Sequence, residues 1–497
     1  MDDEYADTLS TELLPVVIGF LLNCNANRSR SWAPHGKIFP SLVEFDLFTK
    51  LSKRDTIALK VNIPPSELAD TRKFIRFQNE DDPLALNYRP AGLTGLPVSL
   101  CNDILAKFQD NANGSIELVE EDIVFVRNLS NEMCSIFDDE AERRDCFHKL
   151  VGRYFSRVFD IHTFGNKRGT DGSLMFTKGN FQVPLLNLEV KPELGMGSGC
   201  PYVQSTAYYV EFIKKLKDSN SSVITQSRFP VFLMYLAGPY LGVAGAVFLT
   251  TPVCEPLTPV MPLFYRPHHE DMLLRTACVL KALKIALNDL EIFYDQLSHD
   301  SNIKLSQQIS FPYISKMNIG QVVANIIYVK KLDRYIFQAK MEHDNGLSQH
   351  VIVKFAKRYS EECHSTCQGL GIAPRLFSCK WIPGGWCVVV MEQLMGYGSL
   401  SSLAQDKKLS IQKKTMESVK KMHNQGFVHG DMRLSNIMTG PNDSVKIIDF
   451  DWSGKVGEAV YPPLLNPDID WHPDVKAGAK ILPDHDLYML NNSFNSV

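Results

Sequence analysis

The chain has 497 residues, of which 44% are hydrophobic and 22% are charged, with a formal net charge of −4. This composition excludes a disordered chain, and the length predicts two to four domains that each bury a core. The charge gives no overall attraction to nucleic acid, so such binding would need a local basic surface. The 11 cysteines form no CxxC pair or metal-ligand spacing. Free thiols in a reducing compartment, cytoplasmic or nuclear, are therefore expected.

The N-terminal part, residues 1–125, mixes short amphipathic pieces with turn-rich stretches and predicts no particular fold. Its first apolar run, residues 13–22, contains Pro15 and follows an acidic start, which is not typical of a signal peptide. Apolar residues in the stretch 132–159 then predict one or two amphipathic helices.

A set of polar residues in the middle of the chain has the composition of a metal site. Asp171 stands between glycines at the start of a predicted strand, and Glu189 and Lys191 alternate onto one face of the next. Gln204 and Tyr208 follow at i and i+4 of a predicted helix. Two carboxylates at a sheet edge can chelate Mg²⁺ or Mn²⁺, and a neighbouring lysine can orient or deprotonate water, as phosphodiester hydrolysis requires. The alternative is an inactive or purely structural sheet edge.

This Asp…Glu-x-Lys pattern, followed by Gln-x-x-x-Tyr, resembles the PD-(D/E)xK nuclease superfamily and the QxxxY helix of its RecB-like members. The resemblance implies a restriction-endonuclease-like mixed sheet with flanking helices. It also implies Asp171 and Glu189 as metal ligands, Lys191 as the group that activates water, and Gln204 as an orienting residue. A further acid from a preceding helix is implied, for which Glu140 is favoured over Glu142. DNA is the expected substrate.

Residues 229–253 carry no charge over 25 positions and are long enough to span a bilayer. Three prolines and three glycines interrupt them, however, which favours two buried strands, residues 231–237 and 241–250, with a turn at Gly238-Pro239. A membrane span is the alternative, and none is expected. Residues 270–297 then predict a long helix with leucines at helical spacing. The nuclease-like domain is expected at 126–297, followed by a polar linker at 298–312.

The C-terminal part, residues 313–497, carries a second chemical set. In Val-His-Gly-Asp-Met-Arg-Leu-Ser-Asn, residues 428–436, Asn436 follows Asp431 by five positions, and Asp449 follows it by 18 at the end of a predicted strand. Phosphoryl transfer needs a carboxylate to accept the nucleophile's proton, and an amide with a second carboxylate to hold Mg²⁺ on a triphosphate. The spacing predicts a kinase-like phosphotransferase, with a turn beside an acidic strand end as the alternative.

The smaller lobe of such a fold is recognisable upstream. Residues 351–355 predict a strand whose Lys354 would bind the ATP phosphates, and a following short helix offers Glu361 as its ion-pair partner. Residues 376–380 and 388–392 predict two further strands, after which Glu392 would begin the hinge that contacts adenine through backbone groups.

Several features depart from protein kinases. Asp449-Phe450-Asp451 and the glycine before Asp431 resemble aminoglycoside- or choline-kinase-like enzymes. No glycine-rich loop and no Ala-Pro-Glu are found, and a helix containing Asp486 is expected to brace the catalytic loop. A reduced two-lobed kinase-like fold with an unknown acceptor is therefore expected.

The order of the two parts, with the sequence of residues 193–199, 237–240 and 244–248, resembles Crinkler-type effectors and related fungal and oomycete proteins. This resemblance implies a nuclease–kinase fusion acting as an effector or toxin, with a host nucleus as one destination. The Leu-Phe-Leu-Ala-Lys header that such effectors often carry is not found near the start. The alternative functions are an atypical protein or small-molecule kinase with an inactive nuclease-fold scaffold, and a pseudokinase that regulates a dead nuclease domain.

Overall fold

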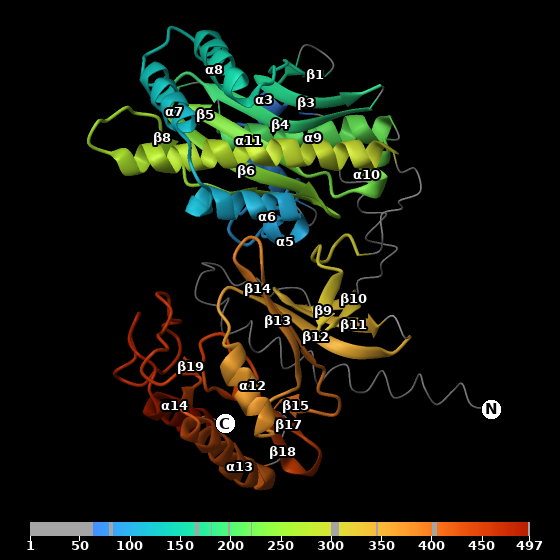
Figure 1. The fold of residues 1–497 in the computed structure, drawn as a ribbon, viewed down its shortest axis with the longest axis vertical. Coiled ribbons are helices and arrows are strands. Elements are labelled where there is room, and N and C mark those ends of the chain that lie inside the picture. The colour runs from blue at the N-terminus through green and yellow to red at the C-terminus, as the bar shows by residue number, and fades with distance from the viewer. Residues whose placement is uncertain are drawn as a thin grey trace, which may run out of the picture. The chain divides into compact units, whose positions relative to one another are not determined.

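The computed structural model describes residues 63–78, 83–164, 168–179, 181–196, 199–219, 221–299, 308–343, 346–399 and 405–495 (Figure 1). The chain divides into two compact units between Tyr313 and Ile314. Within the described residues, the first unit comprises 63–313 and the second unit 314–495. The expected mixed α/β, multidomain class is confirmed. The apolar run 13–22 and most of the expected linker lie outside the described residues.

The first unit is built on a mixed sheet of order β3-β4-β5-β6-β7, with β8 also paired to β6. Only the β4–β5 pair among these strands is parallel. A parallel pair needs a crossover connection, which α9 and α10 provide. The elements are β3 (Gly172–Lys178), β4 (Phe181–Lys191), α9 (Pro201–Asp218), α10 (Ser222–Gln226), β5 (Val231–Ala237), β6 (Tyr240–Phe248), β7 (Pro252–Pro256) and β8 (Met261–Pro262).

The two strands predicted within residues 229–253 are confirmed as β5 and β6. Every residue of β5 is buried, as a central strand covered on both faces requires, which explains its unbroken apolar sequence. Across the described residues, no helix has the length and apolar character needed to cross a membrane.

Helices surround this sheet. The predicted long helix is confirmed as α11 (Glu270–His299), which packs on β3 and β4, whereas α9 packs on β4 and β5. The stretch 132–159, for which one or two amphipathic helices were predicted, contains one, α8 (Glu140–Phe155), and only the last residues of α7 (Glu120–Met133). The short pair β1 (Thr163–Phe164) and β2 (Arg168–Gly169) precedes β3.

Described residues before 126 pack within the first unit and do not form a separate body. These elements are α3 (Pro65–Leu68), α4 (Thr71–Gln78), α5 (Val98–Cys101), α6 (Asp103–Asp110) and the π-helix η1 (Asn111–Ser115). Helix α3 contacts α9, α5 contacts β6 and β7, and α6 contacts α11. The end of the expected linker also belongs here, since the Arg228 guanidinium donates to the carbonyls of Gln308, Ile309 and Phe311.

The second unit begins with a six-stranded antiparallel sheet of order β13-β14-β12-β11-β10-β9. Its strands are β9 (Lys316–Ile319), β10 (Val322–Asp333), β11 (Ile336–His343), β12 (Ser348–Ala356), β13 (Leu376–Ile382) and β14 (Trp386–Glu392), and α12 (Glu361–Gly369) connects β12 to β13. The three strands predicted from residues 351–355, 376–380 and 388–392 are thus confirmed as β12, β13 and β14. Strand β12, which carries Lys354, lies between β11 and β14.

In the residues that the structure describes, the rest of the second unit contains two helices, several short strands and long irregular segments. Its elements are β15 (Gly398–Ser399), α13 (Gln405–Asn424), β16 (Phe427–Val428), the 3-10 turns η3 (Leu434–Asn436) and η4 (Pro441–Asp443), β17 (Ile437–Gly440), β18 (Ser444–Ile447), β19 (Gly454–Lys455) and α14 (Pro483–Asn495). Buried Val419, Met422, Ile447, Met489 and Leu490 pack α13 and α14 onto the β17–β18 hairpin. This core fixes the loops on either side of the hairpin, residues 429–433 and 449–451.

Candidate functional sites

The register of the first sheet brings Asp171 and Glu189 to one place. Gly172 pairs with Leu188 across β3 and β4, so the residue before β3 lies beside the end of β4. The Asp171 carboxylate Oδ2 accepts a hydrogen bond from the backbone N–H of Val190 at 2.8 Å. Asp171 is thereby held between the two functional positions of the Glu-x-Lys motif.

Glu189 is completely buried, with 0% of its surface exposed. Although Asp171 and Asn187 lie nearby, no donor among the described residues approaches either carboxylate oxygen with hydrogen-bonding geometry. Burial, and then the negative charge of Asp171, raise the pKa of Glu189 well above its usual range. A carboxyl in this position is either protonated or neutralised by a cation, so the oxygens fit a divalent metal ion.

Lys191 connects this pair to α8. Its ammonium donates to Oε2 of Glu140 at 3.2 Å and to the carbonyl of Val190 at 2.9 Å. Burial, and then the charge of Asp171, raise the pKa of Glu140. Glu142, the other candidate, accepts instead from the backbone N–H of Asp138 at 3.0 Å. Of the two, Glu140 is the acid at the site.

Helix α9 contacts the site around Asp171 less directly than the sequence predicted. Tyr208 donates from its hydroxyl to the carbonyl of Gly169, which anchors the helix to the loop before Asp171. Gln204, one turn earlier, is buried. Within the described part of the chain, however, no hydrogen bond joins its side chain to Asp171, Glu189 or Lys191.

Sequence reasoning missed His148, on α8 two turns after Glu140. Its ring stacks on Phe159 with 4.6 Å between centroids, and its buried Nε2 has no well-formed hydrogen bond among the described residues. Burial, and then the charge of Arg144, lower the pKa of His148 to about 4, so the imidazole is neutral at pH 7. The same-face spacing from Glu140 was the available signal, but it gains meaning only once α8 is placed beside Asp171.

In the second unit, the loop after β16 forms the predicted constellation around Asp431. Asn436 Nδ2 donates to the Asp431 carboxylate at 3.0 Å and to its carbonyl oxygen at 2.8 Å. Arg433, which was not predicted, binds both carboxylate oxygens of Asp431 through Nε at 2.6 Å and Nη2 at 2.7 Å. Such a bidentate arginine–carboxylate ion pair is strong and geometrically specific.

Asp486 on α14 braces this loop, as expected. Its carboxylate accepts the backbone N–H groups of His429 and Gly430, each at 2.8 Å, and lies 3.0 Å from Nε2 of His423. Gly430 has φ +84°, and a β-carbon there would lie 2.7 Å from the side chain of Ile481. The glycine before Asp431 is therefore required by both backbone conformation and space.

Lys354 lies where β12 meets the Asp449–Asp451 segment. Its ammonium is 2.7 Å from Oδ1 of Asp449 and 2.6 Å from Oδ1 of Asp451. Burial, and then the charge of Asp449, raise the pKa of Asp451 to about 7. Burial opposes the charge on Lys354, but the two carboxylates outweigh it and raise the Lys354 pKa. Asp449 has φ +71°, an unfavourable conformation for a non-glycine residue that often marks a functional position.

Of the other two predicted residues, Glu361 does not pair with Lys354, whereas Glu392 stands at the end of β14, where the start of the hinge was predicted. Glu361 is exposed at the start of α12, and the ion-pair partners of Lys354 are the two aspartates and not this glutamate. Glu392 is exposed at the end of β14, where its side chain accepts the backbone N–H of Arg375 at 3.0 Å. The expected Lys354–Glu361 pair failed because Asp449 and Asp451, distant in sequence, fold onto the lysine.

Helix α12 instead presents His364 to the Asp449–Asp451 segment. The ring of His364 stacks on Phe450 with 4.6 Å between centroids, and its nitrogens meet the Tyr359 hydroxyl at 2.6 Å and the Pro374 carbonyl at 2.9 Å. Because Phe450 lies between Asp449 and Asp451 in the sequence, these contacts fix the position of both aspartates.

Neither family models nor curated proteins offer a match: comparison of the chain with both finds none. Function is therefore inferred from the geometry of the two sites and from the residue patterns that predicted them.

Proposed function

We propose that the first unit is a metal-dependent nuclease that acts on DNA, and that the second unit is an ATP-binding, kinase-like phosphotransferase domain. The observation that carries the proposal is the buried carboxylate of Glu189, which accepts no well-formed hydrogen bond from the described residues, beside Asp171 and Lys191. A structural sheet edge has no reason to bury an acid without a donor, because burial of an uncompensated charge is costly.

Asp171 and Glu189 are the residues that would hold Mg²⁺ or Mn²⁺, with Glu140 as a further acid and His148 adjacent. The metal would supply Lewis-acid stabilisation of charge on the scissile phosphate. Lys191 would orient or deprotonate the attacking water, and its ion pair with Glu140 keeps the ammonium at the site. Gln204 would act as an orienting residue through its position on α9, which the Tyr208 hydroxyl anchors to the carbonyl of Gly169. The mixed sheet with a parallel β4–β5 pair supports a restriction-endonuclease-like fold.

For the second unit, topology and side chains support a reduced kinase-like fold. Strands β10 to β14 form an antiparallel sheet with one helix between the third and fourth strands and a buried lysine on the third. That is where a kinase carries the lysine that binds the ATP phosphates. Asp431 would act as the base, and Asn436 and Asp449 would hold Mg²⁺.

In the second unit, the side chains of Asp431 and Lys354 are already bound by other side chains of the protein. Arg433 binds both oxygens of Asp431, and Asp449 and Asp451 bind Lys354. Nucleotide would have to compete for Lys354. This pairing favours a domain that senses nucleotide, or phosphorylates a small molecule or itself, over a constitutive protein kinase. As a fusion, the chain would act as a Crinkler-like effector or toxin in the cytoplasm or nucleus.

Plasmid cleavage in Mg²⁺ or Mn²⁺ tests the nuclease. Glu189→Ala should abolish cleavage, whereas Glu142→Ala, a nearby acid turned to a helix cap, should leave it intact. Cleavage that survives Glu189→Ala would contradict the assignment and favour the alternative of a scaffold domain.

Calorimetry with Mg²⁺-ATP tests the second unit. The wild-type chain should bind, Asp449→Ala should not, and Asp468→Ala, an exposed acid elsewhere in the same unit, should bind as the wild type does. Absence of binding to the wild-type chain would exclude the ATP-binding proposal without affecting the nuclease.

A further inference from the structure

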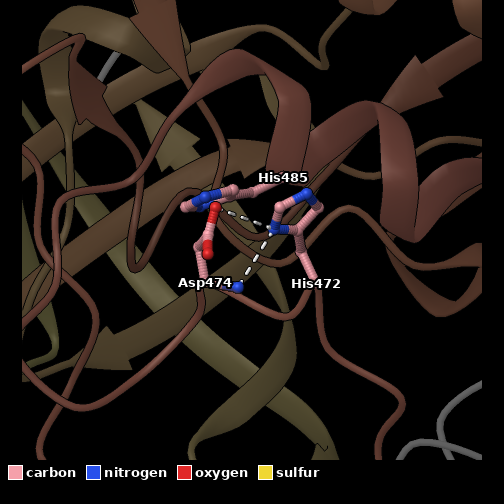
Figure 2. A group of neighbouring side chains, drawn as sticks. All are labelled: His472, Asp474 and His485. Atoms are coloured by element: carbon pink, nitrogen blue, oxygen red, sulfur yellow. Dashed lines mark hydrogen bonds and ion pairs between the residues drawn. The ribbon is translucent and has the colours of Figure 1, made fainter.

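Three potential metal ligands, none of them used in the two sites above, lie together in the second unit. His472 and Asp474 come from the irregular segment between β19 and α14, and His485 comes from the first turn of α14 (Figure 2). One ligand atom from each residue lies within 4.8 Å of the other two. The His472 Nδ1 and Asp474 Oδ2 atoms are 3.9 Å apart.

His485 carries the observation that points to a ligand. Its side chain is only 2% exposed, and its buried Nε2 has no hydrogen-bonding partner among the described residues. Its other nitrogen, Nδ1, lies 3.2 Å from the Tyr461 hydroxyl and 3.4 Å from the backbone N–H of Leu482. Buried polar atoms in native proteins are nearly always satisfied, so an orphaned imidazole nitrogen beside two other ligands calls for an explanation.

Protonation and tautomer are compatible with metal binding. Burial, and then the neighbouring His472, lower the pKa of His485, which keeps the ring neutral and its lone pair available. With a metal on Nε2, the ring proton would sit on Nδ1 and be donated to the Tyr461 hydroxyl, in place of the long 3.4 Å hydrogen bond that Nδ1 accepts from the backbone N–H of Leu482. A metal-bound histidine usually makes this kind of second hydrogen bond through its other nitrogen.

The donor set selects a class of ion. Two imidazole nitrogens and one carboxylate oxygen suit Zn²⁺ and its first-row neighbours, whereas Mg²⁺ and Ca²⁺ prefer oxygen alone. Zinc bonds of about 2.0–2.1 Å place tetrahedral ligand atoms about 3.3 Å apart, so the largest separation would close by about 1.5 Å at most. Asp474 is free to move toward the two imidazoles, because its side chain is 80% exposed and it lies outside any helix or strand.

Metal binding through His472 Nδ1 would replace one existing contact. That nitrogen accepts the backbone N–H of Asp474 at 3.2 Å (Figure 2). Asp474 is an exposed residue, so water can take over this hydrogen bond at little cost.

We propose that His472, Asp474 and His485 bind one divalent first-row transition-metal ion of the zinc class, with water as a fourth ligand. The ion joins the segment 456–482 to the start of α14. His485 is adjacent to Asp486, whose carboxylate holds the backbone of His429 and Gly430, so the ion stabilises the helical turn that braces the catalytic loop.

Cobalt titration of the full chain tests the site, because tetrahedral Co²⁺ has visible d–d bands that octahedral, oxygen-rich sites show only weakly. The wild-type protein should develop these bands with one equivalent of Co²⁺ and lose them when Zn²⁺ is added. Asp474→Ala and His472→Ala should each weaken Co²⁺ binding by at least about tenfold, since even partners of metal ligands contribute this much. Asp468→Ala, an exposed acid of the same segment, should bind like the wild type.

Asp474 is the main variant because its side chain is exposed and its loss should not unfold the protein. As a second readout, Zn²⁺ should raise the melting temperature of the wild-type chain more than that of Asp474→Ala. Wild-type protein without the tetrahedral bands, or bands that survive either substitution at the same affinity, overturns the proposal.

Discussion

The Asp171 carboxylate accepts the backbone N–H of Val190 at 2.8 Å, and this one hydrogen bond sets the geometry of the first site. Val190 lies between Glu189 and Lys191 in the strand, so this hydrogen bond holds Asp171 beside both residues. Asp171 also repels the buried Glu189 carboxylate. The ionised form of Glu189 is therefore unfavourable, and either protonation or a bound cation relieves the repulsion.

This charge makes stability depend on pH. The pKa of Glu189 is raised in the folded protein above its ordinary value of 4.5, so the folded state retains a proton that the unfolded state releases. Without metal, stability should therefore fall as pH rises above about 4.5. Glu189→Gln should reduce this fall, whereas Glu142→Gln should not. Chemical unfolding with a chelator present, followed between pH 5 and pH 8, measures both; identical profiles for the wild type and Glu189→Gln would refute the prediction.

A second pH effect concerns Lys354. Replacing it by methionine leaves Asp449 and Asp451 facing each other, and breaking such a buried pair costs about 3–5 kcal/mol. The Asp451 pKa of about 7 is already above its usual 3.8, so protonation at lower pH relieves the repulsion. Lys354→Met should hence be more destabilising at pH 8 than at pH 5.5.

The matched control for that variant is Lys380→Met, an exposed lysine on β13 of the same sheet. It should change stability by less than about 0.5 kcal/mol. Thermal unfolding of the three proteins at the two pH values makes the comparison. A Lys354→Met protein as stable as the control would show that the two aspartates do not depend on this lysine.

Removal of the Asp486 carboxylate should loosen the loop of residues 429–433, which carries Asp431. Asp486→Ala leaves the buried backbone N–H groups of His429 and Gly430 without acceptors, at about 1–3 kcal/mol for each group. Hydrogen exchange of residues 427–437 should accelerate accordingly. Asp484→Ala, an exposed acid two residues earlier on the same helix, provides the control and should leave exchange in this loop unchanged.

Gly172 gives a steric test of the first site. A β-carbon there would lie 2.5 Å from Nε2 of His148, so Gly172→Ala should displace the imidazole from its place beside Asp171 and destabilise the unit by about 1–3 kcal/mol. Gly92→Ala meets no atom within 4 Å and should be close to neutral. If cleavage activity is found in the wild type, Gly172→Ala should reduce it; equal stability of the two variants would mean that His148 moves freely.

Much of the fold was accessible from sequence because its signals are local. The uncharged run of β5, interrupted by Gly238-Pro239 before β6, and the leucine spacing of α11 each define an element without reference to the rest of the chain. The same is true of the spacing from Asp431 to Asn436, which one short loop brings together.

Interactions between distant segments could not be predicted in this way. Lys354 pairs with residues 95 and more positions away, and the predicted glutamate seven residues away is exposed instead. His148 and Arg433 were overlooked because a lone histidine or arginine has no pattern until its neighbours are placed. The choice between Glu140 and Glu142 likewise depended on how α8 begins. Glu142 accepts the backbone N–H of Asp138, whereas Glu140 accepts the ammonium of Lys191.

The brace from α14 also has a consequence for biosynthesis. Asp486 follows the loop it holds by more than 50 residues, so a nascent chain that has completed the β17–β18 hairpin still lacks the acceptor for His429 and Gly430. Domains fold as they emerge during translation, from the N-terminal side onward. The first unit can therefore be complete while the loop of residues 429–433 is still unformed, and a chain truncated before α14 would keep the first unit but lack the acceptor that holds this loop.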